Sequence, residues 1–209
     1  MQLILAGATG LVGAQVLRLA LADARVTKVI ALARKPLPAH PKLLAPAIDF
    51  DALPQDAAWW RADAVICALG ATMKAAGSQA AFRRVDFDYP LAVARLAHAA
   101  GTPAYVLNSA AGADPSSRFF YNRVKGELEA ALATPGFASL THVRPGLIGG
   151  ERDTVRAGEA ALAFVLKVLA PVLPARWRIN PAGRIAQALL EAAIAATPGV
   201  QVITSGQLS

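Results

Sequence analysis

Short apolar runs recur along the chain, and segments with helical period separate most of them. The runs are continuous rather than alternating in polarity, which is typical of parallel strands whose sheet is covered on both faces. Helical period is clear over 11–22 and 88–100, and Pro90 falls near the start of the second helix, where a missing N–H costs little. We expect strands at 2–7, 28–33, 63–69, 104–109, 139–144 and 200–205, and a further strand that ends at Asp49 and Phe50.

This alternation of strands and helices predicts an α/β fold with a central parallel sheet and right-handed crossovers. The chain of 209 residues suits one domain, and its 55% hydrophobic content is enough to bury a sizeable core. In an open parallel sheet the ligand site lies at the carboxyl ends of the strands. We therefore look for candidate site residues directly after each predicted strand.

A glycine-rich turn, GATGLVG, connects the first strand to the first helix. Glycines at this spacing let the chain turn sharply, approach a pyrophosphate closely and pack the helix on the sheet, while the helix N-terminus offers N–H groups to the phosphates. The alternative is a turn with incidental glycines, but the position between a strand and a helix favours a doubly wound Rossmann domain that binds a dinucleotide. We expect cofactor contacts from Gly7, Thr9, Gly10, Leu11 and Val12.

The end of the second strand distinguishes between the two nicotinamide dinucleotides. NAD is recognised by an acidic residue, about 20 residues after the glycine turn, that binds the ribose 2′-hydroxyl. This chain has Arg34 and Lys35 there instead, and two cations can pair with the 2′-phosphate of NADP(H). We therefore expect NADP(H) in preference to NAD(H). The alternative is that both residues are solvated loop cations.

Two further strand ends complete the expected cofactor site. Asp49 and Phe50 end the third strand, where the adenine would lie. Leu69 and Gly70 follow the fourth strand in the sequence ALG, where small residues leave room for the adenosine half.

Tyr121 and Lys125 lie four residues apart in YNRVK, so they share one face of a predicted helix. A nearby ammonium lowers the pKa of a phenol and makes it a better proton donor and acceptor. The alternative is an ordinary amphipathic helix that buries its aromatic side chains. The positions of other residues favour a catalytic tyrosine. Ser109 directly follows the fifth strand, and Pro145 and Gly146 turn the chain after the sixth. The serine is otherwise a helix cap or turn former, and the proline–glycine pair an ordinary turn.

GATGLVG, Ser109, YNRVK and RPG, in this order and over nearly the whole chain, resemble the motifs of the atypical short-chain dehydrogenases/reductases. Within that superfamily, VDFDYP, NSAAGADPSSRFFYNRVKGELE and VRPGLIGGERD are similar to the Tat-interactive oxidoreductase branch and its bacterial relatives. The resemblance implies that Tyr121 is the general acid/base, that Lys125 binds the ribose and tunes the tyrosine, and that Ser109 orients the substrate carbonyl.

The same resemblance places the nicotinamide carboxamide against the backbone near Leu147 and makes Arg152 a further cation on the cofactor side. One position departs from the family pattern. Many members complete the site with an asparagine on the preceding helix, where this chain has Asp86. A carboxylate cannot donate a hydrogen bond when ionised, so an asparagine-dependent proton relay is in doubt.

Two functions of different classes agree with these motifs. The first is an NADP(H)-dependent oxidoreductase that acts on a small carbonyl or alcohol substrate, with Ser109, Tyr121 and Lys125 as its catalytic residues. The second is an NADP(H)-binding regulator that senses the nucleotide and has little or no turnover. The intact catalytic residues favour the enzyme, while Asp86 and an undefined substrate side leave the regulator open.

We expect residues 150–180 to form a small C-terminal segment on the substrate side. It contains an apolar helical stretch and Trp177 between Arg176 and Arg178, which could cap an aromatic or anionic substrate. The alternative is core packing followed by a solvated loop, because apolar helical stripes are more often core.

Composition excludes several other classes of protein. The net charge is +7, but the 21 basic residues are scattered, whereas a nucleic-acid face needs them clustered. The most apolar stretch, 160–175, contains Lys167 and Pro171 and falls short of the roughly 18 residues needed for a spanning helix. We expect a small-molecule substrate, no nucleic acid and no membrane insertion; a homo-oligomer is possible and the sequence does not specify one.

Cys67 is the only cysteine, and the N-terminus has no basic segment ahead of its short apolar run. Both features fit a cytoplasmic protein. The three histidines are far apart in sequence and match no metal-ligand spacing, so we expect no metal.

Overall fold

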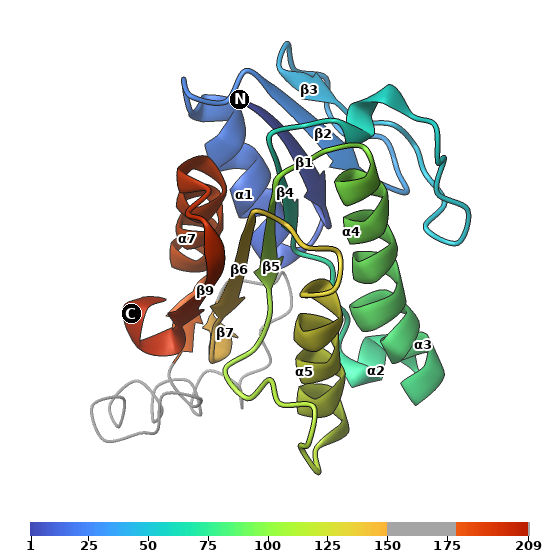
Figure 1. Ribbon diagram of the computed structural model, residues 1–209, viewed down its shortest axis with the longest axis vertical. Coiled ribbons are helices and arrows are strands. Elements are labelled where there is room, and N and C mark those ends of the chain that lie inside the picture. Colours follow the sequence, from blue (N-terminus) through green and yellow to red (C-terminus); the bar gives the residue numbers. More distant parts are fainter. Residues whose placement is uncertain (150–178, 209) are drawn as a thin grey trace, which may run out of the picture.

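A seven-stranded parallel sheet forms the centre of the computed structural model, which describes residues 1–149 and 179–208 (Figure 1). Its strand order is β3-β2-β1-β4-β5-β6-β9, and each neighbouring pair is parallel. The strands are β1 (Gln2–Ala6), β2 (Lys28–Leu32), β3 (Leu43–Leu44), β4 (Ala64–Cys67), β5 (Ala104–Asn108), β6 (Ser139–Arg144) and β9 (Gly199–Thr204). The predicted doubly wound α/β fold is confirmed.

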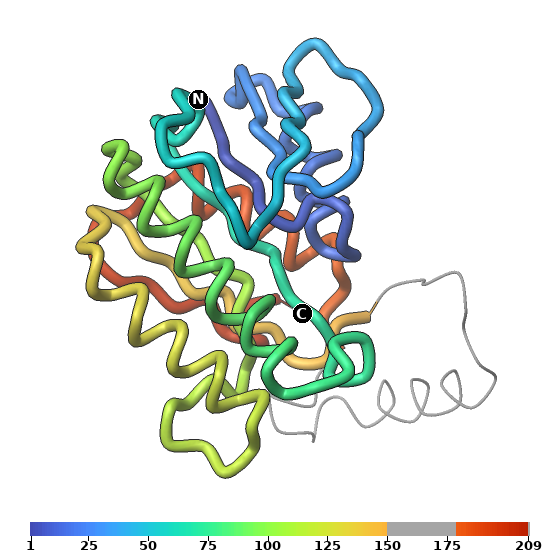
Figure 2. Tube along the Cα trace, turned by 90° about the vertical axis from the view of Figure 1, so that its right-hand side faces the viewer, coloured from blue at the N-terminus to red at the C-terminus, as the bar shows by residue number. Residues whose placement is uncertain are grey.

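Helices cover both faces of this sheet. α1 (Leu11–Ala22) and α7 (Ala182–Ala195) lie on one face, and α4 (Tyr89–Ala99) and α5 (Phe120–Leu132) lie side by side on the other (Figures 1 and 2). The strands run from amino ends at the top of Figure 1 to carboxyl ends at the bottom. The turns and loops that follow the strands therefore gather at one edge, as a ligand site of this fold requires.

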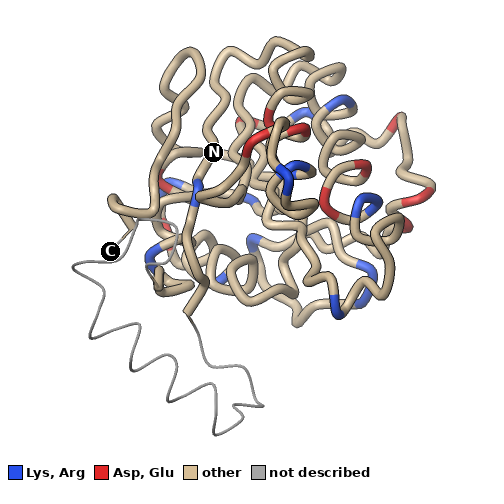
Figure 3. Tube along the Cα trace, turned by 90° about the horizontal axis from the view of Figure 1, so that it is seen from below, with Lys and Arg blue, Asp and Glu red and all other residues tan. Residues whose placement is uncertain are grey.

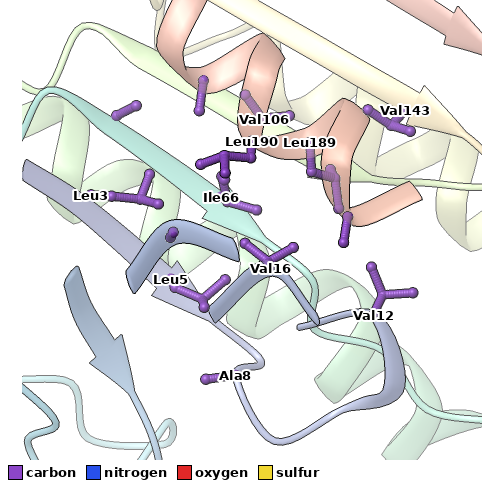
Figure 4. Close-up of a cluster of buried hydrophobic side chains, with 14 of the residues drawn as sticks. Leu3, Leu5, Ala8, Val12, Val16, Ile66, Val106, Val143, Leu189 and Leu190 are labelled. Carbon is purple, nitrogen blue, oxygen red and sulfur yellow. The ribbon is translucent and has the colours of Figure 1, made fainter. Parts of the chain in front are cut away.

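Alternate side chains of β1, β2, β4 and β5 enter different core clusters, which explains why these apolar runs are continuous. Leu3 and Leu5 of β1 pack with α1 and α7, in the cluster drawn in Figure 4, whereas Ile4 and Ala6 pack toward α4 and α5. Because both faces are buried, every position of such a strand is apolar.

The segment from 73 to 99 differs from its predicted form. α2 (Met73–Ala76) is followed by α3 (Gln79–Arg83), a single π-helical turn η2 (Arg84–Asp88) and then α4 without a break. Pro90 is the second residue of α4, near its start as expected, but the helical run extends back to Gln79, so its missing N–H falls inside a longer helix than predicted. Proline cannot donate to the carbonyl one turn earlier, and the wider π turn just before it accommodates that loss.

Two other details differ from prediction. The third strand of the sheet is only two residues long, and a single bridge between Ala33 and Ala47 extends its pairing, so Asp49 and Phe50 follow it in a loop. A second sheet of two parallel strands, β7 (Leu147–Gly149) and β8 (Ile179–Pro181), was not predicted. Three-residue strands are too short to give a readable periodicity. The remaining short helices are η1 (Ala58–Trp60) and η4 (Ser205–Leu208).

Within the two described ranges, no helix has the length and apolar character to cross a membrane.

Candidate active site

The glycine turn has the geometry of a phosphate cradle. Gly7 has a φ of 93°, and a β-carbon there would lie 2.6 Å from the backbone of Ala68, at the end of β4. A β-carbon on Gly13 would lie 1.9 Å from the Gly7 carbonyl oxygen. α1 begins just after Gly10, and no side chain caps its N-terminus. The N–H groups of the first turn are thus left for a ligand, and the cradle fits a diphosphate.

The residues of this turn contribute in different ways. Thr9 and Gly10 are exposed and Leu11 is half-buried. Val12 is buried and its side chain belongs to the core cluster, so it can offer a ligand only its backbone N–H. The expectation of cofactor contact stays a prediction for all of them.

Arg34 and Lys35 directly follow β2 and are both exposed. Neither takes part in any of the ion pairs found in the described part of the chain. Figure 3 marks the Lys and Arg positions in blue and the Asp and Glu positions in red, seen from below. Arg34 and Lys35 are therefore available to an anionic ligand.

The two residues expected near the adenine are not equivalent. Asp49 is exposed, and its carboxylate accepts a hydrogen bond from the Asp51 N–H at 2.9 Å. Phe50 is buried and stacks on Tyr89 with ring centroids 5.3 Å apart. Phe50 thus packs in the core, and its side chain has little surface to offer a cofactor.

Tyr121 and Lys125 lie in the first two turns of α5. Tyr121 is 39% exposed, whereas Lys125 is almost completely buried. The Lys125 Nζ lies 2.8 Å from Oδ1 of Asp86, which is buried in the π turn and whose other carboxylate oxygen accepts from the Ala71 N–H at 2.7 Å. Burial alone would lower the pKa of Lys125, but the negative charge of Asp86, with a smaller contribution from Tyr121, outweighs it and raises that pKa.

Gly70 connects this pair to the glycine turn. A β-carbon on Gly70 would lie 3.3 Å from Asp86 Oδ1 and 3.8 Å from Lys125 Nζ. Leu69, its neighbour, has its backbone nitrogen 2.8 Å from where a β-carbon of Gly7 would lie. The dinucleotide turn, the end of β4 and the Tyr121 helix thus meet at the carboxyl edge of the sheet, as the sequence predicted.

Ser109 has a different environment from the one expected. It is only 4% exposed, and its hydroxyl donates to Glu129 Oε1 at 2.5 Å. Arg144 binds the same carboxylate through Nε, at 3.0 Å to Oε1, and through Nη2 to Oε2. The proton that was expected to reach a substrate carbonyl is committed to Glu129.

Sequence reasoning missed Glu129. Tyr121, Lys125 and Glu129 follow one another at intervals of four in YNRVKGELE, so all three lie on one face of α5. A glutamate on the buried face of a helix needs a partner, and that was the signal that could have identified it.

The turn after β6 is held in place by hydrogen bonds. The Pro145 carbonyl accepts from the Ala111 N–H at 2.8 Å, and the Gly146 N–H donates to the fully buried Asn180 side chain at 2.7 Å. Leu147 is 41% exposed at the start of β7. The expectations for Arg152 and for Arg176, Trp177 and Arg178 lie outside the described residues, as does the 150–180 segment up to 178.

No group of three or more histidine, cysteine, aspartate or glutamate residues that could hold a metal occurs in the described ranges.

A family model described as NAD(P)H-binding matches residues 7–158, which contain the glycine turn, Ser109, Tyr121 and Lys125. The chain belongs to this NAD(P)H-binding family. The predicted relation to the atypical short-chain dehydrogenases/reductases is confirmed, because Protein HTATIP2 of Rattus norvegicus is 37% identical over 158 residues, which cover 73% of this chain and 65% of that protein.

Fungal relatives in the family resemble the chain over more of their length. The mitochondrial protein fmp52 of Emericella nidulans is 36% identical over 178 residues, which cover 80% of this chain and 76% of the relative. The corresponding protein of Coccidioides immitis is 32% identical over 212 residues, which cover 93% of this chain and 86% of the relative.

Solved structures of other proteins share the fold. The oxidoreductase ylbE of Lactococcus lactis has a TM-score of 0.70 at 19% identity, over 100% of this chain and 94% of that chain. The human epimerase family protein SDR39U1, solved with NADPH, has a TM-score of 0.63 at 20% identity, over 100% of this chain and 76% of that chain. At these identities the likeness establishes the fold alone.

The expectation of a cytoplasmic protein is wrong, because the similar fungal proteins are named as mitochondrial. It rested on a single cysteine and on an N-terminal apolar run with no basic segment ahead of it. Neither feature separates the cytoplasm from other reducing compartments.

Proposed function

We propose that this protein is an NADP(H)-dependent oxidoreductase of the short-chain dehydrogenase/reductase type that acts on a small carbonyl or alcohol substrate. The observation that carries the proposal is the position of Lys125. Its ammonium is buried beside Gly70 at the end of β4 and lies on the same helix face as the partly exposed Tyr121. This arrangement supports the proposal, because Lys125 lies beside the loop that packs against the glycine turn and is one helical turn from Tyr121.

In the reductive direction, NADPH would supply, when bound, the hydride that the carbonyl carbon takes up. Tyr121 holds the proton that the carbonyl oxygen takes up, so that the product is an alcohol. Lys125, one turn along α5, attracts the negative charge that remains on the phenol oxygen once the proton has left. The first-turn N–H groups of α1 would hold the diphosphate of the cofactor.

Replacing Tyr121 with Phe tests the proton transfer. NADPH-dependent turnover of a carbonyl panel should fall about 100- to 10,000-fold, the usual contribution of a positioned acid, while the NADPH dissociation constant changes little. Tyr89→Phe is the matched control, because that phenol belongs to α4 and stacks on Phe50. Turnover that survives in Tyr121→Phe and in the control alike would remove Tyr121 from the mechanism.

The preference for NADP(H) rests on Arg34 and Lys35. The double variant Arg34→Ala/Lys35→Ala should weaken NADPH binding about 10- to 100-fold, as expected for lost charge-assisted hydrogen bonds, and leave NADH binding nearly unchanged. The control Lys28→Ala/Arg61→Ala removes the same charge from exposed positions at the opposite edge of the sheet. Equal loss of NADPH and NADH affinity would contradict the assignment of the 2′-phosphate.

One observation favours a second candidate, an NADP(H)-binding regulator with little or no turnover. The Ser109 hydroxyl is buried and donates to Glu129, so in this arrangement it has no proton to offer a substrate carbonyl. The regulator is favoured if no carbonyl or alcohol is turned over by protein that binds NADPH, and if the nucleotide changes binding of a protein partner.

A further inference from the structure

Asp86 and Lys125 form an ion pair between two elements that are distant in sequence. Asp86 belongs to the π turn η2 and Lys125 to α5, and their side chains are 1% and 4% exposed. A buried ion pair contributes little net stability, because the cost of desolvating both charges offsets their attraction. Well-packed apolar side chains would hold the two elements together at least as well, which points to a role for these charges beyond packing.

A second ion pair between the same two regions serves as a comparison. Arg83 of α3 lies 2.5 Å from Glu127 of α5, but these side chains are 40% and 31% exposed. Glu127 is two residues from Lys125 and therefore lies on another face of the helix. The chain thus already connects α5 to the 79–99 helix at the surface, and the buried pair is not needed for that purpose.

The local backbone fixes the Asp86 carboxylate. The π turn ends just before Pro90, whose ring removes one N–H from the helix. Phe82, Asp86 and Pro90 all face inward, and the Ala71 N–H binds Asp86 Oδ2 at 2.7 Å. The carboxylate is therefore held between the loop after β4 and the lysine, with its other oxygen turned to Lys125.

We propose that Asp86 is a positioning residue, whose carboxylate holds the Lys125 ammonium charged and in place beside Gly70 at the carboxyl edge of β4. The inference rests on the proposed function, in which Lys125 serves both the nucleotide and Tyr121.

The groups that face Lys125 determine how it titrates. Burial disfavours its ammonium, and Asp86, Tyr121 and Cys67 from three different elements favour it. Asp86 contributes the largest favourable part, and the pKa of Lys125 is raised above the ordinary value. Without the Asp86 charge, burial is opposed only by the weaker contributions of Tyr121 and Cys67, so the ammonium loses its proton at lower pH.

The direct test is a pH titration of the Lys125 side chain by ¹⁵N NMR, with its signal assigned from its loss in Lys125→Met. In the wild-type protein Lys125 should titrate above the ordinary lysine value of 10.5. In Asp86→Asn, which keeps the shape and removes the charge, it should titrate below the wild-type midpoint. NADPH binding should weaken about tenfold or more, the usual effect of losing a group that orients a ligand-binding side chain.

Glu127→Gln is the matched control, because it removes one carboxylate from α5 and its exposed ion pair. It should leave both the Lys125 titration and NADPH affinity unchanged. The alkaline limb of kcat/KM for carbonyl reduction should move to lower pH in Asp86→Asn and stay in place in Glu127→Gln. The lysine titration and NADPH binding do not require turnover, so a protein that reduces no carbonyl would contradict the proposed function and still test the role of Asp86.

Folding of each variant is checked by circular dichroism. If Asp86→Asn does not fold, Asp86→Glu keeps the charge on a longer side chain and should retain the raised Lys125 titration. An Asp86→Asn protein that is folded and has the wild-type lysine titration overturns the proposal.

Discussion

At the residue scale, the candidate site is a set of buried charges that neutralise one another on one face of α5. Lys125 pairs with Asp86, and Glu129 binds Ser109 and Arg144. Each pair comes from elements far apart in sequence, so each also fixes how those elements meet. Tyr121, in the first turn of the same helix, is partly exposed.

His142 belongs to the same region and gives the protein a specific pH dependence. Burial, with Arg144 opposing and Glu129 supporting the charged form, lowers its pKa below the ordinary value of 6.5. The unfolded chain therefore binds a proton more readily than the folded one as pH falls below about 6.5, and stability is lost in that range, by up to about 1.4 kcal/mol per pH unit.

Thermal unfolding at pH 7.5 and 5.5 checks this. His142→Gln should lose less stability between the two values than the wild type does, whereas His40→Gln, at an exposed position, should behave like the wild type. An unchanged loss in His142→Gln would mean that other groups produce the acid sensitivity.

The sequence was sufficient to pair Tyr121 with Lys125, because a spacing of four is fixed by the helix. It could not show that Asp86 faces Lys125, since that contact joins two elements and depends on a π turn that shifts the helical phase. It also could not show that Glu129 removes the Ser109 proton, for the same reason.

At the element scale, the unit from β1 to α1 is the best determined part of the site. Its strand, turn and helix were all predicted, because glycine has no side chain and Gly7 and Gly13 have contacts that exclude one. The sequence misplaced the short strand β3 and did not predict β7 or β8, since two or three residues give no periodicity.

Substituting Gly13 tests how tightly this unit is packed. Gly13→Ala would press a methyl group against the Gly7 carbonyl oxygen, 1.9 Å away in the present backbone. We expect it to lower the free energy of unfolding by about 3 kcal/mol or more, the upper part of the range for overpacking, and to weaken NADPH binding.

Gly183→Ala is the control, because Gly183 lies in the first turn of α7 and a β-carbon there meets no atom within 4 Å. Its effect should range from neutral to a gain of about 1 kcal/mol. Similar denaturant midpoints for the two variants would show that the turn relaxes and that its close packing is not required.

At the scale of the whole molecule, the strand order places the site. β1 lies between β2 and β4 in the sheet, so the connections from β1 and from β4 lead to opposite sides of the sheet. The loops separate there and leave room for a ligand. Continuous apolar runs predicted this parallel sheet, and the family match agrees with it. The periodicity of the sequence did not determine which residues form the substrate side.

The most direct test of the account is a crystal structure of the protein with NADP⁺. We predict the diphosphate at the first turn of α1, the 2′-phosphate between Arg34 and Lys35, and the nicotinamide C4 facing a substrate position within about 3–3.5 Å of the Tyr121 hydroxyl. A nicotinamide ring that lies away from Tyr121, or a diphosphate bound elsewhere than at the glycine turn, would contradict the central claim.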